Sequence, residues 1–109
     1  MNIRTSSKLR EYLKKDDIVI GLCDGAFDLL HPGHIMHLAN CRKLCDYLVV
    51  AVAEDKFVAR KGKGRPVISE DERLLAVRSL RCVGHAFLCD GSVRVVNKFN
   101  PDVYFRNAD

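Results

Sequence analysis

The sequence has 109 residues and a formal net charge of +4, and 48% of its residues are hydrophobic against 29% charged. This is the size and composition of one globular domain. The small positive charge is compatible with an anionic substrate but does not indicate nucleic-acid binding. The N-terminus lacks the apolar core of a secretory signal, and the longest apolar run, residues 47–53, is too short to cross a membrane. We therefore expect one cytoplasmic domain over residues 1–109 that binds neither nucleic acid nor membranes.

The first half of the chain alternates helix-like and strand-like patterns. Apolar spacing predicts a short helix over residues 7–15, and the apolar runs 18–23 and 46–53 predict buried strands. Between these strands, residues 35–44 have the spacing of a helix. Its core-facing stripe would consist of Ile35, Leu38, Cys41 and Cys45. A strand, a helix and a strand at this spacing indicate a parallel, right-handed βαβ unit.

The second half continues the alternation. A helix is predicted to begin after Ser69, whose side chain would cap it together with Glu72 in a capping box. The apolar residues of this helix would be Leu74, Leu75, Val77 and Leu80. Residues 85–89 and 102–105 predict two further strands, separated by a helix over residues 93–99. The whole pattern predicts an α/β, Rossmann-like, doubly wound fold with at least four parallel strands, the first two of them adjacent.

The five cysteines are an odd number in a chain without a targeting signal, which favours reduced thiols. Cys41 and Cys45 would share one face of the predicted helix, as a metal-binding pair does, but their apolar surroundings favour packing. His37 would lie on the same side of that helix as His34. A ligand role is open for it, and a partly buried structural role is favoured. We expect no metal site built from protein side chains.

The stretch Gly25–His34, which reads Gly-Ala-Phe-Asp-Leu-Leu-His-Pro-Gly-His, links the first strand to the helix that follows. The first N–H groups of a helix are unpaired and attract phosphate, so this loop is a candidate anion site. His31 and His34 could donate hydrogen bonds to the same phosphate. Pro32 suits the first helical turn, and Gly33, without a Cβ, would let a ligand approach the backbone closely.

A basic loop, residues 56–67, follows the second strand and carries four cations and two glycines between Arg60 and Arg65. A solvated surface loop is the plain interpretation. Parallel strands end at one edge of the sheet, however, and α/β proteins bind their ligands outside that edge. The position of this loop therefore favours phosphate binding.

The motif, a His-x-Gly-His pattern preceded by Gly-x-Phe-Asp, resembles the cytidylyltransferase-like family of nucleotidyltransferases, over about residues 19–109. It is similar to heptose-1-phosphate adenylyltransferases and glycerol-3-phosphate cytidylyltransferases. The resemblance implies nucleotidyl transfer from ATP or CTP to a phosphorylated sugar or polyol, with release of pyrophosphate, a Mg²⁺ cofactor and a homodimer. The phrase Lys-Gly-x-Gly-Arg-Pro-Val at 61–67 favours heptose-phosphate adenylylation. Glycerol-phosphate cytidylylation is the alternative, and a non-catalytic nucleotide-binding module is a second one.

The resemblance also implies roles for individual residues. The catalytic residues would be His31, His34 and Lys61. The nucleotide would be bound by Gly25, Ala26, Phe27, His31, Gly33, His34, Lys61, Lys63 and Arg81. The second substrate would be bound by Asp28, Arg73 and Asp109. For Asp28, capping of the helix and contact with the metal or the acceptor both remain open. Mg²⁺ would be held mostly by water and phosphate, so few protein carboxylates are required.

The sequence departs from the family pattern at two places. Val83-Gly84 stands where relatives usually have valine-aspartate, and Asp109 is followed by neither the family's final strand nor its phosphate-binding loop and helix. We therefore expect a C-terminally incomplete domain, either a fragment or a shortened member. The 109 residues by themselves should then bind nucleotide weakly and turn over poorly or not at all.

Overall fold

The computed structural model describes residues 17–92 and 94–106, with the side chain of Lys61 left aside. Its elements in chain order are β1 (Ile20–Gly25), α2 (Pro32–Arg42), β2 (Tyr47–Ala53), α3 (Asp55–Val58), the 3₁₀ turn η1 (Ala59–Lys61), α4 (Glu70–Arg78), β3 (His85–Cys89), α5 (Arg94–Phe99) and β4 (Val103–Phe105). The helix predicted over residues 7–15 lies outside the described residues. Among those described, no helix has the length and apolar character needed to span a membrane.

The strands form one parallel sheet in the order β3-β2-β1-β4, with β1 paired to β2 so that Cys23 lies opposite Val50. This confirms the predicted α/β class and the adjacency of the first two strands. Helices on both faces of a parallel sheet bury its strands from both sides, and β2 is buried from Leu48 to Ala53. That burial explains why β2 has a nearly continuous apolar sequence rather than an alternating one.

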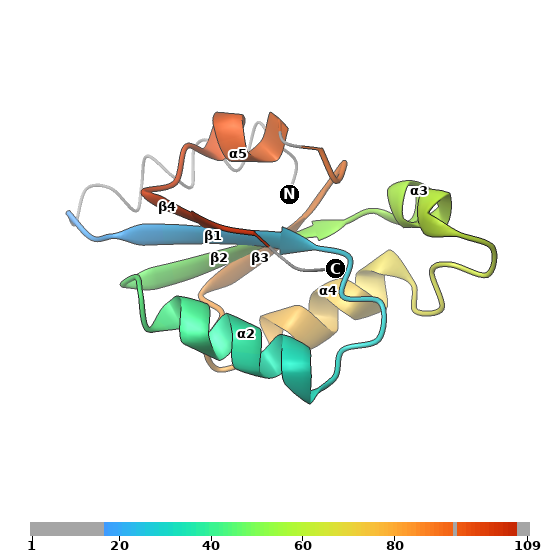
Figure 1. The fold of residues 1–109 in the computed structure, drawn as a ribbon, viewed down its shortest axis with the longest axis horizontal. Helices are drawn as coiled ribbons and strands as arrows, with labels where there is room; N and C mark the ends of the chain where they lie inside the picture. Colours follow the sequence, from blue (N-terminus) through green and yellow to red (C-terminus); the bar gives the residue numbers. More distant parts are fainter. Residues whose placement is uncertain (1–16, 93, 107–109) are drawn as a thin grey trace.

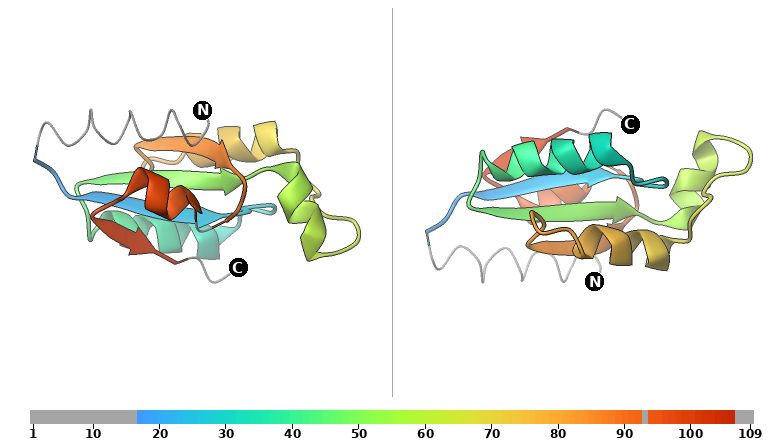
Figure 2. Two further views of the ribbon diagram at one scale, coloured as in Figure 1. Left: turned by 90° about the horizontal axis from the view of Figure 1, so that it is seen from above. Right: turned by 90° about the horizontal axis from the view of Figure 1, so that it is seen from below.

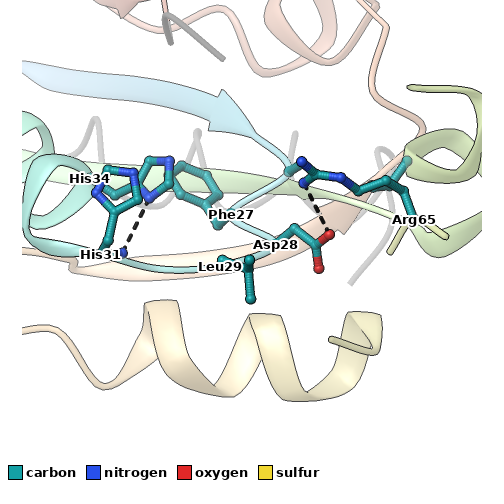
Figure 3. A pocket seen from close by; sticks show the side chains of 8 residues that line it. Phe27, Asp28, Leu29, His31, His34 and Arg65 are labelled. Carbon is teal, nitrogen blue, oxygen red and sulfur yellow. Dashed lines mark hydrogen bonds and ion pairs between the residues drawn. The ribbon is translucent and has the colours of Figure 1, made fainter. Parts of the chain in front are cut away.

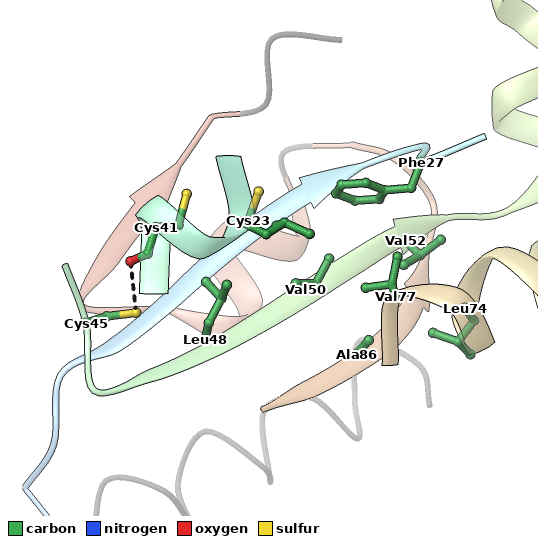
Figure 4. Packing of buried hydrophobic residues seen from close by; sticks show 11 residues of the cluster. Cys23, Phe27, Cys41, Cys45, Leu48, Val50, Val52, Leu74, Val77 and Ala86 are labelled. Atoms are coloured by element: carbon green, nitrogen blue, oxygen red, sulfur yellow. Dashed lines mark hydrogen bonds between the residues drawn. The ribbon is translucent and has the colours of Figure 1, made fainter. Parts of the chain in front are cut away.

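The sheet is the middle of three layers: α2 and α4 cover one face and α5 covers the other (Figure 1). Leu38 of α2 and Val77 of α4 are fully buried in the first core cluster, which Figure 4 shows. Phe99 of α5 packs near Phe87 of β3 in the second, with ring centroids 6.3 Å apart. The α3 helix and the loop after it extend beyond the carboxyl ends of the strands (Figure 2).

The core-facing stripe of α2 differs from the predicted one. The helix begins at Pro32, three residues before the expected start, and Ile35 is 40% exposed while Leu38 and Cys41 are buried. One turn before Leu38, the residue on the sheet side is His34, whose ring meets the edge of Phe27 at 5.8 Å between centroids. His34 is therefore the first residue of the core-facing stripe of α2. Ile35, the next residue, faces solvent.

The helix predicted after Ser69 is α4, and the Ser69 side chain accepts the N–H of Glu72 as expected. The Glu72 carboxylate accepts from the Ser69 hydroxyl at 2.9 Å, so the reciprocal bond runs through side chains. Leu74 and Val77 form the buried side of this helix, whereas Leu75, one position after Leu74, is 65% exposed.

Candidate active site at the carboxyl edge of the sheet

The first half of the predicted basic loop is helical, because residues 56–61 belong to α3 and η1. A pocket of about 400 Å³ lies where the loop after β1 meets this basic segment (Figure 3). It is lined by Ala26, Phe27, Asp28, Leu29, His31, His34, Val58 and Arg65. All four strands are parallel, so their carboxyl ends share the edge at which this pocket opens. The fold thus unites the motif stretch with one arginine of the basic loop, two segments that are separate in the sequence.

Both motif histidines are fixed through their Nδ1 atoms, which accept backbone N–H groups at the start of α2. His31 is the N-cap of α2, and its Nδ1 accepts the Gly33 N–H at 3.0 Å. The Nδ1 of His34 accepts the His31 N–H at 3.3 Å, which closes a reciprocal capping box, and the two rings lie 4.0 Å apart between centroids. With Nδ1 accepting, the hydrogen-bond pattern assigns the proton of each neutral ring to Nε2. Each ring therefore carries a donor on the nitrogen that the cap does not use.

The structure gives a different reason for glycine at position 33 from the one expected. A Cβ built on it would lie 2.7 Å from Cε1 of His31, so the missing side chain makes room for the capping ring. The first N–H groups of α2 are not unpaired either: Gly33 donates to the His31 ring, and His34 donates to the His31 carbonyl at 2.9 Å. What this end of the helix offers an anion is its dipole and two imidazoles.

Phe27 connects the motif loop to the buried core. Its backbone has a φ of 53°, a left-handed conformation, and the residue is only 2% exposed. The ring belongs to the first core cluster and meets His34 edge-on. Phe27 thus anchors the motif loop and fixes the His34 ring, while its edge contributes to the pocket wall.

Asp28 does not cap α2, because His31 occupies that position. Its carboxylate is buried and accepts the N–H groups of Val67 at 2.9 and 3.0 Å and of Ile68 at 2.9 Å, with Arg65 Nη1 at 3.3 Å. Burial opposes ionisation of this carboxyl, but the N–H donors of Ile68 and Val67 and the Arg65 guanidinium outweigh it and lower its pKa. Asp28 therefore docks the end of the basic loop onto the motif.

Arg73 is not placed as a ligand for phosphate in this structure. It is 1% exposed, and its guanidinium donates to the Ile68 carbonyl at 2.9 Å, the Ala26 carbonyl at 2.6 Å and the Asp55 carboxylate at 2.8 Å. Ala26 lies in the loop after β1, Asp55 is the first residue of α3, and Ile68 lies in the segment that leads into α4. Arg73 thus ties together three segments around the pocket and has the geometry of a positioning residue.

The remaining candidate residues lie in different parts of the domain, and most of them do not line the pocket. Gly25 ends β1 and leads into the pocket, and Lys63 is exposed in the basic loop. The side chain of Lys61 and all of Asp109 lie outside the described residues. Arg81 is exposed in the turn before β3, at the amino end of a strand whose carboxyl end faces the pocket edge. The structure does not bring Arg81 to the pocket.

Gly84 lies at the same far edge as Arg81. Its N–H donates to the Leu48 carbonyl at 2.8 Å, and the Tyr47 hydroxyl donates to the Gly84 carbonyl at 2.8 Å. A Cβ on Gly84 would come within 2.5 Å of the Tyr47 ring. The departure from the family's aspartate at this position is thus a local packing arrangement at the amino end of the sheet, distant from the pocket.

Sequence reasoning did not single out Leu29, Val58 and Arg65, which also line the pocket. Arg65 is the most significant of them, because its side chain is 50% exposed and contributes a cation to the pocket wall. It belongs to the same basic run as Lys61 and Lys63, so a signal was available in the sequence. The three-dimensional path of the loop, fixed by Asp28, decides which cation of the run faces the pocket.

With this geometry in view, comparison with known proteins shows that the model of the cytidylyltransferase-like family matches residues 22–109. The chain belongs to the cytidylyltransferase-like family of nucleotidyltransferases. A solved structure, the lipopolysaccharide core biosynthesis protein from Thermoplasma volcanium GSS1, matches with a TM-score of 0.72 and 33% sequence identity. That match covers 80% of this chain and 72% of the solved one.

Curated relatives of this cytidylyltransferase-like chain carry two different names. The FAD synthase of Methanocella paludicola is 42% identical over 72% of this chain and 57% of its own length. The FAD synthase of Methanocorpusculum labreanum is 53% identical over 61% of this chain and 46% of its own length. The bifunctional protein HldE of Helicobacter pylori strain HPAG1 is 36% identical over 94% of this chain but 23% of its own length. The chain thus spans about half or less of the length of these relatives.

Members of this family typically use a divalent metal. Of the described residues that line the pocket, Asp28 is the one carboxylate, and its oxygens already accept from Val67, Ile68 and Arg65. A Mg²⁺ ion keeps several waters and binds substrate phosphates more readily than an all-protein cage. The donor set here fits an ion that arrives on the nucleotide, and no cage of protein carboxylates is available in the described pocket wall.

Proposed function

We propose that this chain carries the nucleotidyl-transfer site of an adenylyltransferase, which moves AMP from ATP to a phosphate monoester and releases pyrophosphate. The observation that carries the proposal is the pair His31 and His34, each fixed through Nδ1 at the wall of the pocket. Fixed donors need no reorganisation when charge develops on a phosphoryl group, which is the main requirement of this reaction.

In the proposed reaction, an acceptor phosphate oxygen forms a bond to the α-phosphorus of ATP. The bond from that phosphorus to the oxygen bridging to the β-phosphate breaks, and pyrophosphate leaves with the electron pair. The Nε2 donors of His31 and His34 would bind the α-phosphoryl oxygens as they gain charge, supported by the positive end of the α2 dipole. Bound Mg²⁺ would neutralise charge on the phosphates.

The basic loop supplies the proposed contacts to the β- and γ-phosphates. Arg65 lines the pocket, and its guanidinium can bind two phosphate oxygens at once. Lys61 and Lys63 would act as further point charges from the same loop. The N–H groups of Val67 and Ile68, held by the Asp28 carboxylate, fix where that loop returns to the body of the domain. A fixed return point keeps the cations within reach of a nucleotide in the pocket.

Adenine is proposed because two relatives are named FAD synthase, and FAD consists of AMP joined to a flavin phosphate. The first acceptor we propose is a phosphorylated sugar of the heptose 1-phosphate type, because the sequence Lys61–Val67 resembles that of heptose-phosphate adenylyltransferases. A flavin phosphate is a second acceptor, which the sequence analysis did not consider, and the 42% and 53% identities to the FAD synthases support it. Cytidylylation of glycerol 3-phosphate remains the alternative; the family description supports a cytidylyl donor in general and names no acceptor. A homodimer remains a prediction.

Pyrophosphate release measured over a grid of substrates tests the proposal. ATP and CTP are each combined with heptose 1-phosphate, riboflavin 5′-phosphate and glycerol 3-phosphate, in the presence of Mg²⁺. We expect release with ATP and the sugar phosphate; release with ATP and the flavin phosphate would keep adenylyl transfer and replace the acceptor. Turnover with CTP alone would contradict the adenylyl assignment. Nucleotide binding without turnover in any combination would favour a non-catalytic module.

A further inference from the structure

A second group of chemically active side chains lies on the α2 side of the sheet, outside the pocket wall. Cys23 of β1 and Cys41 of α2 are buried, and their sulfurs lie 3.8 and 3.7 Å from Nε2 of His37. All three candidate ligand atoms lie within 4.8 Å of one another. Nothing in the proposed nucleotidyl transfer uses these residues.

The convergence follows from the packing of one helix on one strand. His37 and Cys41 are four residues apart on α2, so their side chains share a face of the helix. Cys23 projects from β1 into the core cluster on the same side (Figure 4). Cys45 comes after the helix, and its thiol donates to the Cys41 carbonyl at 3.4 Å. The pair expected from the sequence, Cys41 and Cys45, is therefore not the group that converges.

The spacing of the three atoms is that of a metal site. Around a tetrahedral zinc ion, with Zn–S of about 2.3 Å and Zn–N of about 2.0 Å, a sulfur and a nitrogen lie roughly 3.5 Å apart. The sulfur–nitrogen separations of 3.8 and 3.7 Å are already close to this value. An ion could enter with small side-chain movements, and His37, which is half-buried, lies on the side nearer solvent.

We propose that Cys23, His37 and Cys41 bind one thiophilic divalent cation, for which Zn²⁺ is the best fit. Two thiolates and an imidazole form a soft ligand set, which disfavours Mg²⁺ and Ca²⁺ and suits zinc. The two thiols release their protons to solvent when the ion binds, and a water completes the coordination. The ion links β1 to α2, the two elements that flank the motif loop, so its role is structural.

Cobalt provides the direct test, because Co²⁺ takes the zinc geometry and its thiolate bonds absorb light. The reduced protein is titrated with Co²⁺ and then with Zn²⁺ in the presence of a competing chelator. We expect one ion per chain, a thiolate-to-cobalt charge-transfer band, and displacement of Co²⁺ by Zn²⁺. Folded, reduced protein that takes up Co²⁺ without this band, or takes up no ion, would overturn the proposal.

Variants identify the ligands. Cys23→Ser, Cys41→Ser and His37→Gln should each weaken Zn²⁺ binding by about 100-fold or more, since losing even a residue that only supports a ligand costs about 10–100-fold. Cys89→Ser is the matched control, because Cys89 is 3% exposed and lies in the core cluster on the other face of the sheet. Its affinity should equal that of the unchanged protein.

The two serine substitutions replace buried thiols and put folding at risk, so two measurements do not depend on them. His37→Gln alters a half-buried side chain and should fold while losing the ion. In the unchanged protein, one equivalent of Zn²⁺ should raise the melting temperature, and the same addition to His37→Gln should not. Equal affinity and equal melting shifts in the two proteins would show that His37 does not bind the ion and would overturn the proposal.

Discussion

The Asp28 carboxylate accepts the backbone N–H of Val67 with both of its oxygens, at 2.9 and 3.0 Å (Figure 3 shows its place beside Arg65). The two residues are separated by 39 positions in the sequence. The bond joins the motif loop to the end of the basic loop, so a buried carboxylate, together with Arg73, determines the shape of the pocket.

Asp28→Asn should destabilise the protein by about 1–3 kcal/mol, because an amide cannot accept all the donors that the carboxylate accepts. The midpoint of urea unfolding measures this effect, and proteolysis after Lys61 and Lys63 should become faster as the loop loses its anchor. Asp71→Asn, an exposed carboxyl in the first turn of α4, is the control and should change the midpoint little. Equal effects of the two substitutions would refute the docking role of Asp28.

Stability should depend on pH in the acid range through two carboxyls. Asp28 has a pKa below its ordinary value of 3.8, and hydrogen bonds from Ser92 and Arg94 lower the pKa of Asp90 to about 2. A group with a lowered folded pKa stabilises the native state fully above its unfolded pKa. That stabilisation is lost as pH falls through the folded value. Unfolding midpoints should therefore fall below about pH 4, and less steeply in Asp28→Asn.

Arg73→Lys should cost about 1–3 kcal/mol of stability, although it keeps the charge. A lysine ammonium cannot reach all three acceptors that the buried guanidinium binds. Thermal or urea unfolding measures the loss. Arg81→Lys is the matched control, and both its stability and its turnover should be unchanged, because Arg81 is exposed at the far edge of the sheet. A loss of turnover in Arg81→Lys would restore the phosphate role expected from the sequence.

Arg65→Gln should lower kcat/KM for ATP by roughly 10–100-fold, the effect of losing one charge-assisted hydrogen bond to phosphate at about 1.5–3 kcal/mol. Steady-state pyrophosphate release at varied ATP measures it. Arg94→Gln removes an equivalent exposed arginine, paired with Asp90 and outside the pocket wall, and should leave kcat/KM unchanged. Identical kinetics of Arg65→Gln and the unchanged protein would remove Arg65 from the site.

The strands were predictable because burial on both faces selects continuous apolar runs. The third strand, residues 85–89, has the predicted bounds, whereas β1 continues to Gly25, two residues beyond the prediction. Polar Asp24 and small Gly25 still pair with β2, opposite Ala51 and Val52. The run of apolar side chains ends at Cys23, but the backbone continues to pair beyond it. A prediction from hydropathy therefore ends this strand too early.

The site was predictable only in part. Motif residues line the pocket, and the structure adds two roles that the sequence did not indicate, His31 as an N-cap and Asp28 as an anchor for the basic loop. Ser, Thr, Asp and Asn are the usual caps, so an imidazole Nδ1 in that role has no sequence signal. Arg73 reaches the Ala26 carbonyl, 47 residues away. Partners so distant in the chain cannot be inferred from local patterns, because tertiary packing alone brings them together.

If the Nε2 donors of His31 and His34 stabilise the transition state, substitutions that remove the imidazoles but preserve the helix cap should lower turnover without unfolding the protein. Asparagine is a strong N-cap, and glutamine at the third helical position can complete a capping box, so His31→Asn and His34→Gln should keep α2 intact. His85→Gln, at the amino end of β3, is the control.

The measurement is the turnover number for pyrophosphate release with ATP and its acceptor, taken beside the urea-unfolding midpoint of each variant. We expect His31→Asn and His34→Gln each to lose about 10²–10³-fold in turnover, with midpoints close to that of the unchanged protein, while His85→Gln keeps full turnover. Full turnover in either motif variant would show that the replaced imidazole does not stabilise the transition state.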